Sequence, residues 1–186
     1  MKTSFYTDSE LRELGLKTFG KNVLISRNAS FYNPENISLG DNVRIDDFCI
    51  LSGKITLGSY VHISAFCALY GARQIIFEDF SGISARVTIY SAIDDFSGRH
   101  LTNSTVPEKY KQISGGPVCL KKYVQIGAHT VVLPDLNLEE GVAVGAMSLV
   151  NKSLPAWGIY AGIPASFLKD RQKNLLKLEK QLEGTL

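Results

Sequence analysis

Apolar side chains recur at every sixth residue along most of this 186-residue chain. The recurrence is interrupted after position 69 and again after position 89, and no polar residue replaces an apolar one within it. Its members are Leu39, Ile45, Leu51, Leu57, Ile63, Leu69, Phe77, Ile83, Ile89, Leu120, Ile126, Val132, Leu138, Val144 and Val150. A strand repeats about every 2 residues and a helix about every 3.6, so neither element alone produces this period. Short strands separated by sharp corners do produce it.

A second register supports this interpretation. Four residues after most of the apolar positions stands a small or apolar residue, as at Val43, Cys49, Ile55, Val61, Cys67, Ser81, Val87, Val124, Thr130, Leu136, Val142, Ser148 and Leu154. Glycine, which tolerates corner dihedral angles, often follows the apolar residue, as at Gly40, Gly58, Gly127 and Gly145. A β-sandwich would space its strands about 8–12 residues apart, so the fixed spacing of six argues against that fold. Three such hexads close a triangular coil, so the sequence predicts an all-β fold, a parallel β-helix of stacked coils.

Three segments depart from the repeat. Residues 1–20 contain a short predicted helix over 8–15, with Asp8 or Ser9 near its N-cap. Residues 165–186 carry helix-spaced apolar residues and predict an amphipathic C-terminal helix. Residues 94–117 form a long polar insertion within the β-helix of residues 21–164, and such loops are usually functional or disordered. We therefore expect one domain over residues 1–186, with its active site at the base of this loop.

Composition narrows the classes of partner. The net charge of +2 gives no electrostatic argument for nucleic acid. The three cysteines are an odd number without CxxC spacing, which argues against a disulfide framework or a zinc knuckle. The N-terminal residues lack the apolar core of a signal peptide, and no apolar run is long enough to span a membrane. These features predict a cytoplasmic protein with reduced thiols.

Three ordered motifs resemble those of the hexapeptide-repeat acyltransferases, in the branch of galactoside, maltose and xenobiotic acetyltransferases. They are QIGAHTVVLPD at 125–135, EGVAVGAMSLVNKSLP at 140–155 and AGIPA at 161–165. The resemblance implies that the β-helix is left-handed and that the protein is a homotrimer. It also implies acetyl transfer from acetyl-CoA to a sugar or nucleotide-sugar acceptor, in the synthesis of surface polysaccharide or lipopolysaccharide such as O-antigen.

The same resemblance implies a CoA site. Backbone groups at Ala128 and Ala146 would flank the pantetheine arm, and Lys152 would lie near the adenosine and its phosphates. Gly145 and Gly162 complete the predicted set. Small residues leave room for a narrow ligand against the coils, and a lysine is a suitable phosphate partner.

The catalytic base departs from the family pattern. In the galactoside-type enzymes a histidine stands at the root of the loop, after a V-T-[IL] coil; here Val87–Ile89 match that coil, but the position is Asp94, followed by Asp95. In one interpretation Asp94 or Asp95 orients an amine, because a carboxylate with an ordinary pKa of about 4 is a poor base for a hydroxyl. In a second, His62 or His100 supplies the base. In a third, the site is inactive.

Competing functions remain open at this point. The first alternative is an N-acetyltransferase specific for a nucleotide-linked amino sugar. A metalloenzyme resembling γ-class carbonic anhydrases would need three zinc-binding histidines, and His62, His100 and His129 occupy unrelated hexad positions, so no metal is expected. A non-catalytic binding or scaffold protein would not need the loop and the three motifs together.

Overall fold

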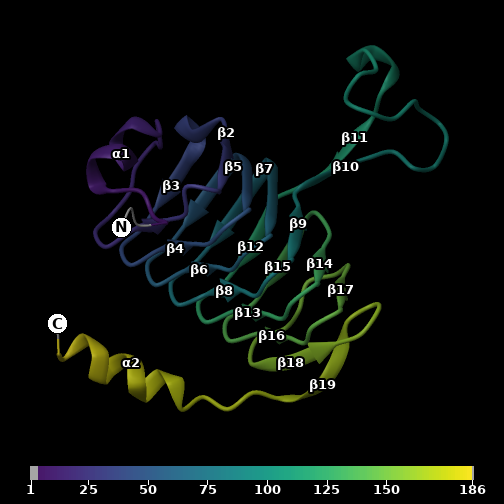
Figure 1. Ribbon diagram of the computed structural model, residues 1–186. Coiled ribbons are helices and arrows are strands. Elements are labelled where there is room, and N and C mark those ends of the chain that lie inside the picture. Colours follow the sequence, from purple (N-terminus) through teal and green to yellow (C-terminus); the bar gives the residue numbers. More distant parts are fainter. Residues whose placement is uncertain (1–3, 186) are drawn as a thin grey trace.

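The computed structural model describes residues 4–185 and is a left-handed parallel β-helix with three faces (Figure 1). Face 1 comprises β1 (Leu24–Ile25), β4 (Arg44–Ile45), β6 (His62–Ile63), β8 (Gly82–Ile83), β13 (Gln125–Ile126), β16 (Ala143–Val144) and β18 (Gly158–Ala161). Face 2 comprises β2 (Ser30–Tyr32), the beginnings of β5 (Ile50–Leu57) and β7 (Ala68–Phe77), β9 (Thr88–Tyr90), β14 (Val131–Val132) and β17 (Leu149–Val150). Face 3 comprises β3 (Ile37–Leu39), the ends of β5 and β7, β12 (Val118–Leu120) and β15 (Leu136–Leu138).

The interior confirms the six-residue repeat. Every apolar position of the predicted series is buried, and so is every member of the second, smaller register named above. Parallel pairing stacks equivalent residues, as in the column of Ile45, Ile63, Ile83 and Ile126. Burying these side chains is the main stabilising term of the fold, at about 1.5–3 kcal/mol for each large aliphatic one.

The corners hold a feature that the sequence does not predict. Many corner residues have positive φ although they are not glycine, among them Tyr60, Phe80 and Tyr123. The rings of these three residues stack coil on coil, with centroids 4.6 Å and 5.9 Å apart. Positive φ is unfavourable for bulky residues, so this stacking helps to offset a backbone cost.

Helix α1 (Asp8–Glu13) covers the N-terminal end of the coils, where the helix over 8–15 was predicted. Its N-cap is Thr7 and not Asp8 or Ser9. Thr7 and Glu10 form a reciprocal capping box that satisfies two backbone N–H groups, and this pairing decides where the helix begins. A short 3₁₀ turn, η1 (Pro34–Asn36), precedes β3. Residues 1–3 of the predicted 1–20 segment lie outside the described residues.

The C-terminal segment differs from the predicted helix over 165–186. Ser166–Asp170 form strand β19, which pairs antiparallel with β18, and helix α2 covers only Leu175–Glu183. Without β19 the last coil would leave backbone groups of β18 unpaired, and satisfying them outweighs the helical pattern of the side chains. Residue 186 lies outside the described residues. Helix α2 then runs back beneath the coils toward the N-terminal end (Figure 1). No helix within residues 4–185 has the length and apolar character needed to cross a bilayer.

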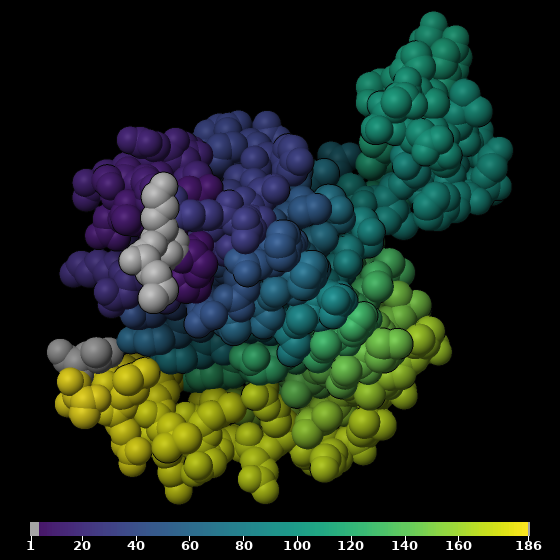
Figure 2. Space-filling model, viewed as in Figure 1, coloured from purple at the N-terminus to yellow at the C-terminus, as the bar shows by residue number. Residues whose placement is uncertain are grey.

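The long insertion projects from the body of the β-helix as a separate lobe (Figures 1 and 2). Its root is ordered, because β10 (Ala92–Asp94) pairs antiparallel with β11 (Ile113–Gly115). A 3₁₀ turn, η2 (Glu108–Tyr110), lies near its far end. The predicted loop over 94–117 is therefore a two-stranded ribbon that carries a folded tip.

Candidate functional site

Four of the five predicted CoA-binding residues lie together on one corner of the β-helix. We call the turn positions between faces 1 and 2 of the last coils the corner row: Gly127, Ala128, Gly145, Ala146, Ala161 and Gly162. Successive coils bond through this corner, with Met147 N–H donating to the Ala128 carbonyl at 2.8 Å and Leu149 N–H to the Gly162 carbonyl at 3.0 Å. Glycine and alanine leave the backbone there without large side chains.

The corner row is tightly built. A Cβ atom added at Gly127 would lie 2.4 Å from the Ala146 backbone nitrogen, so only glycine fits. Ser148, buried behind the row, donates to the Gly145 carbonyl at 2.8 Å and accepts from the Gly162 N–H at 3.1 Å. These bonds hold the row rigid. The strip therefore leaves its backbone open to a thin, extended ligand.

Lys152 lies away from the corner row. It follows β17 and stands exposed at the rim of a groove of about 490 Å³, which Pro155, Phe167 and Asp170 also line. Its ammonium has no ion-pair partner within residues 4–185. The structure therefore leaves Lys152 able to meet a phosphate, but at a different corner from the other predicted CoA residues.

The root of the inserted loop carries the predicted carboxylates. Asp94 ends β10, where it pairs with Ile113, and its side chain is partly exposed. Asp95 accepts hydrogen bonds from Ser97 N–H at 2.8 Å and from His100 Nδ1 at 2.7 Å. The hydrogen bonds from Ser97 and His100 lower the pKa of Asp95 to about 2. Asp95 is therefore engaged within the loop, whereas Asp94 is left available.

His62 belongs to a separate polar cluster on face 1. Its Nε2 lies 2.8 Å from Asp46 Oδ2, and Asp46 Oδ1 accepts from Arg44 Nε at 2.7 Å. Partial burial raises the pKa of Asp46, but the hydrogen bonds from Arg44 and His62 outweigh that effect and lower it. The carboxylate orients an imidazole that is half exposed.

Within one chain the predicted catalytic residues therefore lie in two separate places and do not form a single site. Asp94, Asp95 and His100 lie at the loop root and in the loop, beyond the end of face 2. His62 lies on face 1 with Asp46 from the preceding coil. Among residues 4–185 no group of His, Cys, Asp and Glu side chains is arranged to hold a metal ion.

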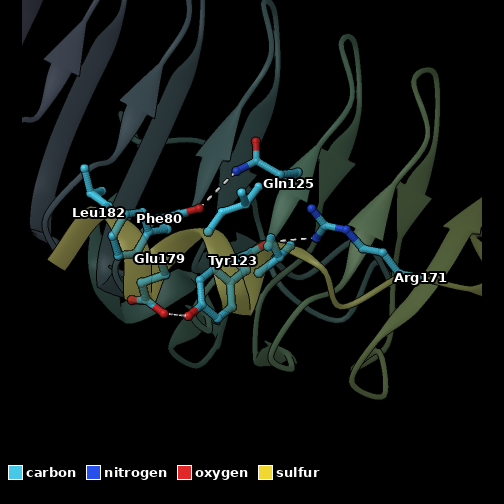
Figure 3. Close-up of a pocket in the computed structure, with 8 residues that line it drawn as sticks. Phe80, Tyr123, Gln125, Arg171, Glu179 and Leu182 are labelled. Carbon is cyan, nitrogen blue, oxygen red and sulfur yellow. Dashed lines mark hydrogen bonds between the residues drawn. The ribbon is translucent and has the colours of Figure 1, made fainter. Parts of the chain in front are cut away.

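A cavity of about 440 Å³ lies between the coils and α2 (Figure 3). None of the predicted site residues lines it. The lining residues are Phe80, Tyr123, Gln125, Arg171, Leu175, Leu178, Glu179 and Leu182. The Arg171 guanidinium is occupied by backbone carbonyls, including that of Tyr123 at 2.7 Å. Glu179 accepts from Tyr123 Oη and pairs with Lys122 Nζ at 2.6 Å. The cavity is the space left between the coils and α2, and Arg171 and Glu179 join the two sides.

Comparison with known proteins shows full-length relatives. The chain is 42% identical over 179 residues to a dTDP-4-amino-4,6-dideoxy-D-glucose acyltransferase of Escherichia coli, covering 95% of this chain and 93% of the relative. It is 52% identical to AntD, an N-acyltransferase from Bacillus cereus solved with dTDP and 3-hydroxybutyryl-CoA, with a TM-score of 0.96 and coverage of 99% and 98%. A maltose O-acetyltransferase from Clostridium difficile, at 21% identity and TM-score 0.58 over 89% and 75% of the two chains, shares the fold. No family model matches the chain.

Other structures of AntD point to a residue that sequence reasoning missed. The S84A variant was solved with dTDP-4-amino-4,6-dideoxyglucose and CoA, at 51% identity, TM-score 0.97 and full coverage of both chains, and the D94N variant with dTDP and CoA. This chain has Ser84 and Asp94 at the same residue numbers. Ser84 is exposed on the corner one coil before Gly127, and its N–H donates to the Ile126 carbonyl at 2.8 Å. The hexad pattern gave no signal for it, because outward corner positions accept almost any residue.

Proposed function

We propose, since this chain belongs to the hexapeptide-repeat acyltransferases, that it transfers an acetyl group from acetyl-CoA to the 4-amino group of a dTDP-linked 4-amino-4,6-dideoxy sugar. The observation that carries the proposal is full-length similarity at about half identity to AntD, whose structures hold that amino sugar together with CoA. The departure at Asp94 agrees with it, because a carboxylate suits an amine acceptor better than a hydroxyl. O-acetylation of a sugar is the second candidate, favoured by the resemblance to maltose acetyltransferases.

The reaction joins the acceptor nitrogen to the acetyl carbon and breaks the carbon–sulfur bond of the thioester. The nitrogen must present its lone pair, so its ammonium form first loses a proton, which Asp94 collects and passes to solvent. A second proton leaves the nitrogen on amide formation and ends on the CoA sulfur, so that CoA departs as its thiol. We assign Asp94 to orienting the amine, and we place Ser84 beside the acceptor. The corner row, with Ala128, Gly145, Ala146 and Gly162, takes the pantetheine arm, and Lys152 meets a phosphate of CoA.

Three further assignments complete the proposal. The protein acts as a homotrimer, which is supported by the projecting loop and its exposed Phe96 and Leu101, since both present apolar surface away from their own coils. It acts in the cytoplasm, supported by the free thiols of Cys49, Cys67 and Cys119. Its product serves the synthesis of a surface polysaccharide.

The first test is a thiol-release assay with acetyl-CoA and 3-hydroxybutyryl-CoA against two acceptor panels. One panel holds dTDP-linked amino sugars; the other holds the matching hydroxyl sugars with simple galactosides and maltosides. We expect turnover with the amines alone. Turnover with hydroxyl acceptors would overturn the amine assignment and direct the search for a base to His62 and His100.

Asp94→Asn tests the residue assignment. The neutral amide cannot collect the proton that the ammonium form must lose, so we expect kcat to fall about 100-fold or more, with an unchanged KM for acetyl-CoA. Asp8→Asn on α1 is the matched control and should behave as the wild type. Wild-type kcat in Asp94→Asn would remove Asp94 from the mechanism while leaving the acceptor class standing.

A further inference from the structure

The outer edge of the corner between faces 1 and 2 is built from residues with positive φ. We call this set the corner edge: Phe48, Phe66, Arg86, His129 and Met147. Each N–H bonds to a carbonyl of the preceding coil, as Arg86 does to Ala65 at 3.1 Å and His129 to Ala85 at 3.1 Å. The edge therefore runs as one line parallel to the corner row. Phe48, Phe66 and Met147 are apolar, and Arg86 carries a fixed positive charge in the middle of the line.

Arg86 is held in place without being neutralised. Its guanidinium carbon lies 4.9 Å from the centre of the Phe66 ring, and that ring stacks on Phe48 at 5.0 Å. Within residues 4–185 its side chain meets no carboxylate and makes no hydrogen bond. A guanidinium on an aromatic face keeps its N–H groups in the plane of the fork, pointed outward and available to an oxyanion.

The other well-placed arginines are already engaged. Arg44 Nε donates to Asp46 at 2.7 Å, and Arg27 pairs with Glu10 at 2.6 Å. Arg171 donates to backbone carbonyls under α2. Arg86 is thus the arginine of this corner that is free to bind an anion.

We propose that Arg86 binds the diphosphate of the nucleotide-linked acceptor and so selects nucleotide sugars over free sugars. The inference rests on the proposed function, which places the acceptor beside Ser84, two residues before Arg86 in the same turn. A nucleoside diphosphate carries at least two negative charges, and a chain with a net charge of only +2 must meet them with local cations. The planar guanidinium fork matches phosphate oxygens bidentately. The acceptor then occupies the coil of Ser84 and Arg86, and the acyl donor occupies the Gly127–Gly162 coils that follow.

The test is calorimetric binding of dTDP, followed by steady-state kinetics with the dTDP-linked amino sugar. Arg86→Gln should weaken dTDP binding and raise the acceptor KM about 10- to 100-fold, the effect of losing a hydrogen-bonded charge, with the KM for acetyl-CoA unchanged. Arg86→Lys should recover part of the affinity. The matched control is Arg73→Gln, at an exposed arginine of the corner between faces 2 and 3, whose backbone N–H donates to Ser91 Oγ. Weakening by Arg73→Gln in place of Arg86→Gln would overturn the assignment.

A double-mutant cycle separates recognition from mere structure. Phe66→Leu removes the ring under the guanidinium and should weaken dTDP binding about 2- to 5-fold, the range of an exposed cation–π contact. That loss should vanish in the Arg86→Gln background; an equal loss there would mean that Phe66 acts without Arg86.

Measuring both dTDP binding and turnover distinguishes a failure of the Arg86 assignment from a failure of the proposed acyl transfer. Wild-type protein that binds dTDP through Arg86 but acylates no amino sugar would refute the proposed reaction and leave the anion site standing. Turnover with dTDP binding unchanged in Arg86→Gln would refute Arg86 alone. A wild-type protein that binds no dTDP would refute both.

Discussion

At the scale of single residues, the glycines of the corner row set how closely the coils approach. At Gly127 the nearest atoms to an added Cβ are backbone atoms of Ala146 and Gly145, which cannot rotate away. A side chain there must push two coils apart. The bare strip assigned to the pantetheine arm is therefore a consequence of close coil packing at this corner.

Gly127→Ala tests this coupling. Because the clash is with backbone, we expect a loss of about 1–3 kcal/mol in the free energy of unfolding, together with a higher KM for acetyl-CoA. Thermal unfolding and steady-state kinetics measure the two effects. Gly184→Ala, where the nearest atom to the new Cβ is the Lys180 carbonyl oxygen at 3.5 Å, is the control and should change neither. A stable Gly127→Ala protein with a normal KM would show that the coils adjust freely.

Some site residues were predictable and others were not, for reasons that individual residues show. Ala128 and Ala146 have the same place in equivalent hexads of consecutive coils, so their alignment follows from the period alone. The partners Asp46 of His62 and Asp95 of His100 do not follow from it, because their side-chain rotamers and the fold of the loop decide those pairings. Phe66 and Arg86 at positive φ contradict residue preference, and only the surrounding coils impose that geometry.

At the scale of elements, the loop lobe depends on a few side-chain bonds within a short turn. Asp95, directly after β10, accepts hydrogen bonds from Ser97 N–H and His100 Nδ1. These bonds fix the direction in which the chain leaves the ribbon. The folded state lowers the pKa of Asp95 to about 2. The stabilisation from these bonds is therefore fully present above the ordinary aspartate pKa of about 4 and is lost as the pH falls toward 2.

Asp95→Asn should loosen this turn at neutral pH much as acid does in the wild type. We expect faster hydrogen exchange at the Ser97 amide in the variant, and in the wild type a rise in that exchange, beyond the intrinsic pH effect, between about pH 4 and pH 2. Glu108→Gln alters the loop's other ion pair, with Lys111, and should leave the Ser97 amide unchanged. Equal protection in Asp95→Asn and wild type would mean that the ribbon alone orders the turn.

The elements also show where sequence periodicity stops being informative. The hexad rule places the face strands from β3 to β17 because each hexad buries its own side chains, whereas β1, β2 and β18 lie outside the series. It fails at Ser166–Asp170, where the side-chain pattern favours a helix but the neighbouring edge of β18 offers backbone partners. Phe167 then packs its ring edge-on against Tyr160, with centroids 5.7 Å apart, and this contact reinforces the strand.

At the scale of the whole molecule, α2 is fastened to the coils mainly through Glu179. Its carboxylate takes bonds from Tyr123 and Lys122, and the leucines around it roof a cavity instead of filling a core. The segment between β19 and α2 is exposed, apart from a partly buried Arg171. The chain is therefore anchored by Arg171 before the helix begins and by Glu179 within the helix, like a strap held at these two residues.

Glu179→Ala should release that strap. Loss of the two bonds is expected to cost about 1–3 kcal/mol of the strap's docking free energy and to speed proteolysis at residues 172–174, while the coils keep their cooperative unfolding. Limited proteolysis with mass spectrometry reads this directly. Glu183→Ala, an exposed acid of the same helix, is the matched control. If cleavage stays slow in Glu179→Ala, the leucines hold the helix by themselves.

Strand β19 has a consequence for how long an assembly of such coils can grow. A parallel β-helix that ended on a bare coil would offer the start of an identical molecule a matching edge, and the two prisms would join end to end. Here the last face-1 partner runs in the opposite direction, with a register shift between Ile159 and Tyr160, while α1 covers the first coils. Reversed polarity and a bulge make that edge a poor template for another parallel strand. The chain thereby resists polymerisation into fibres, although its repeat would otherwise favour it.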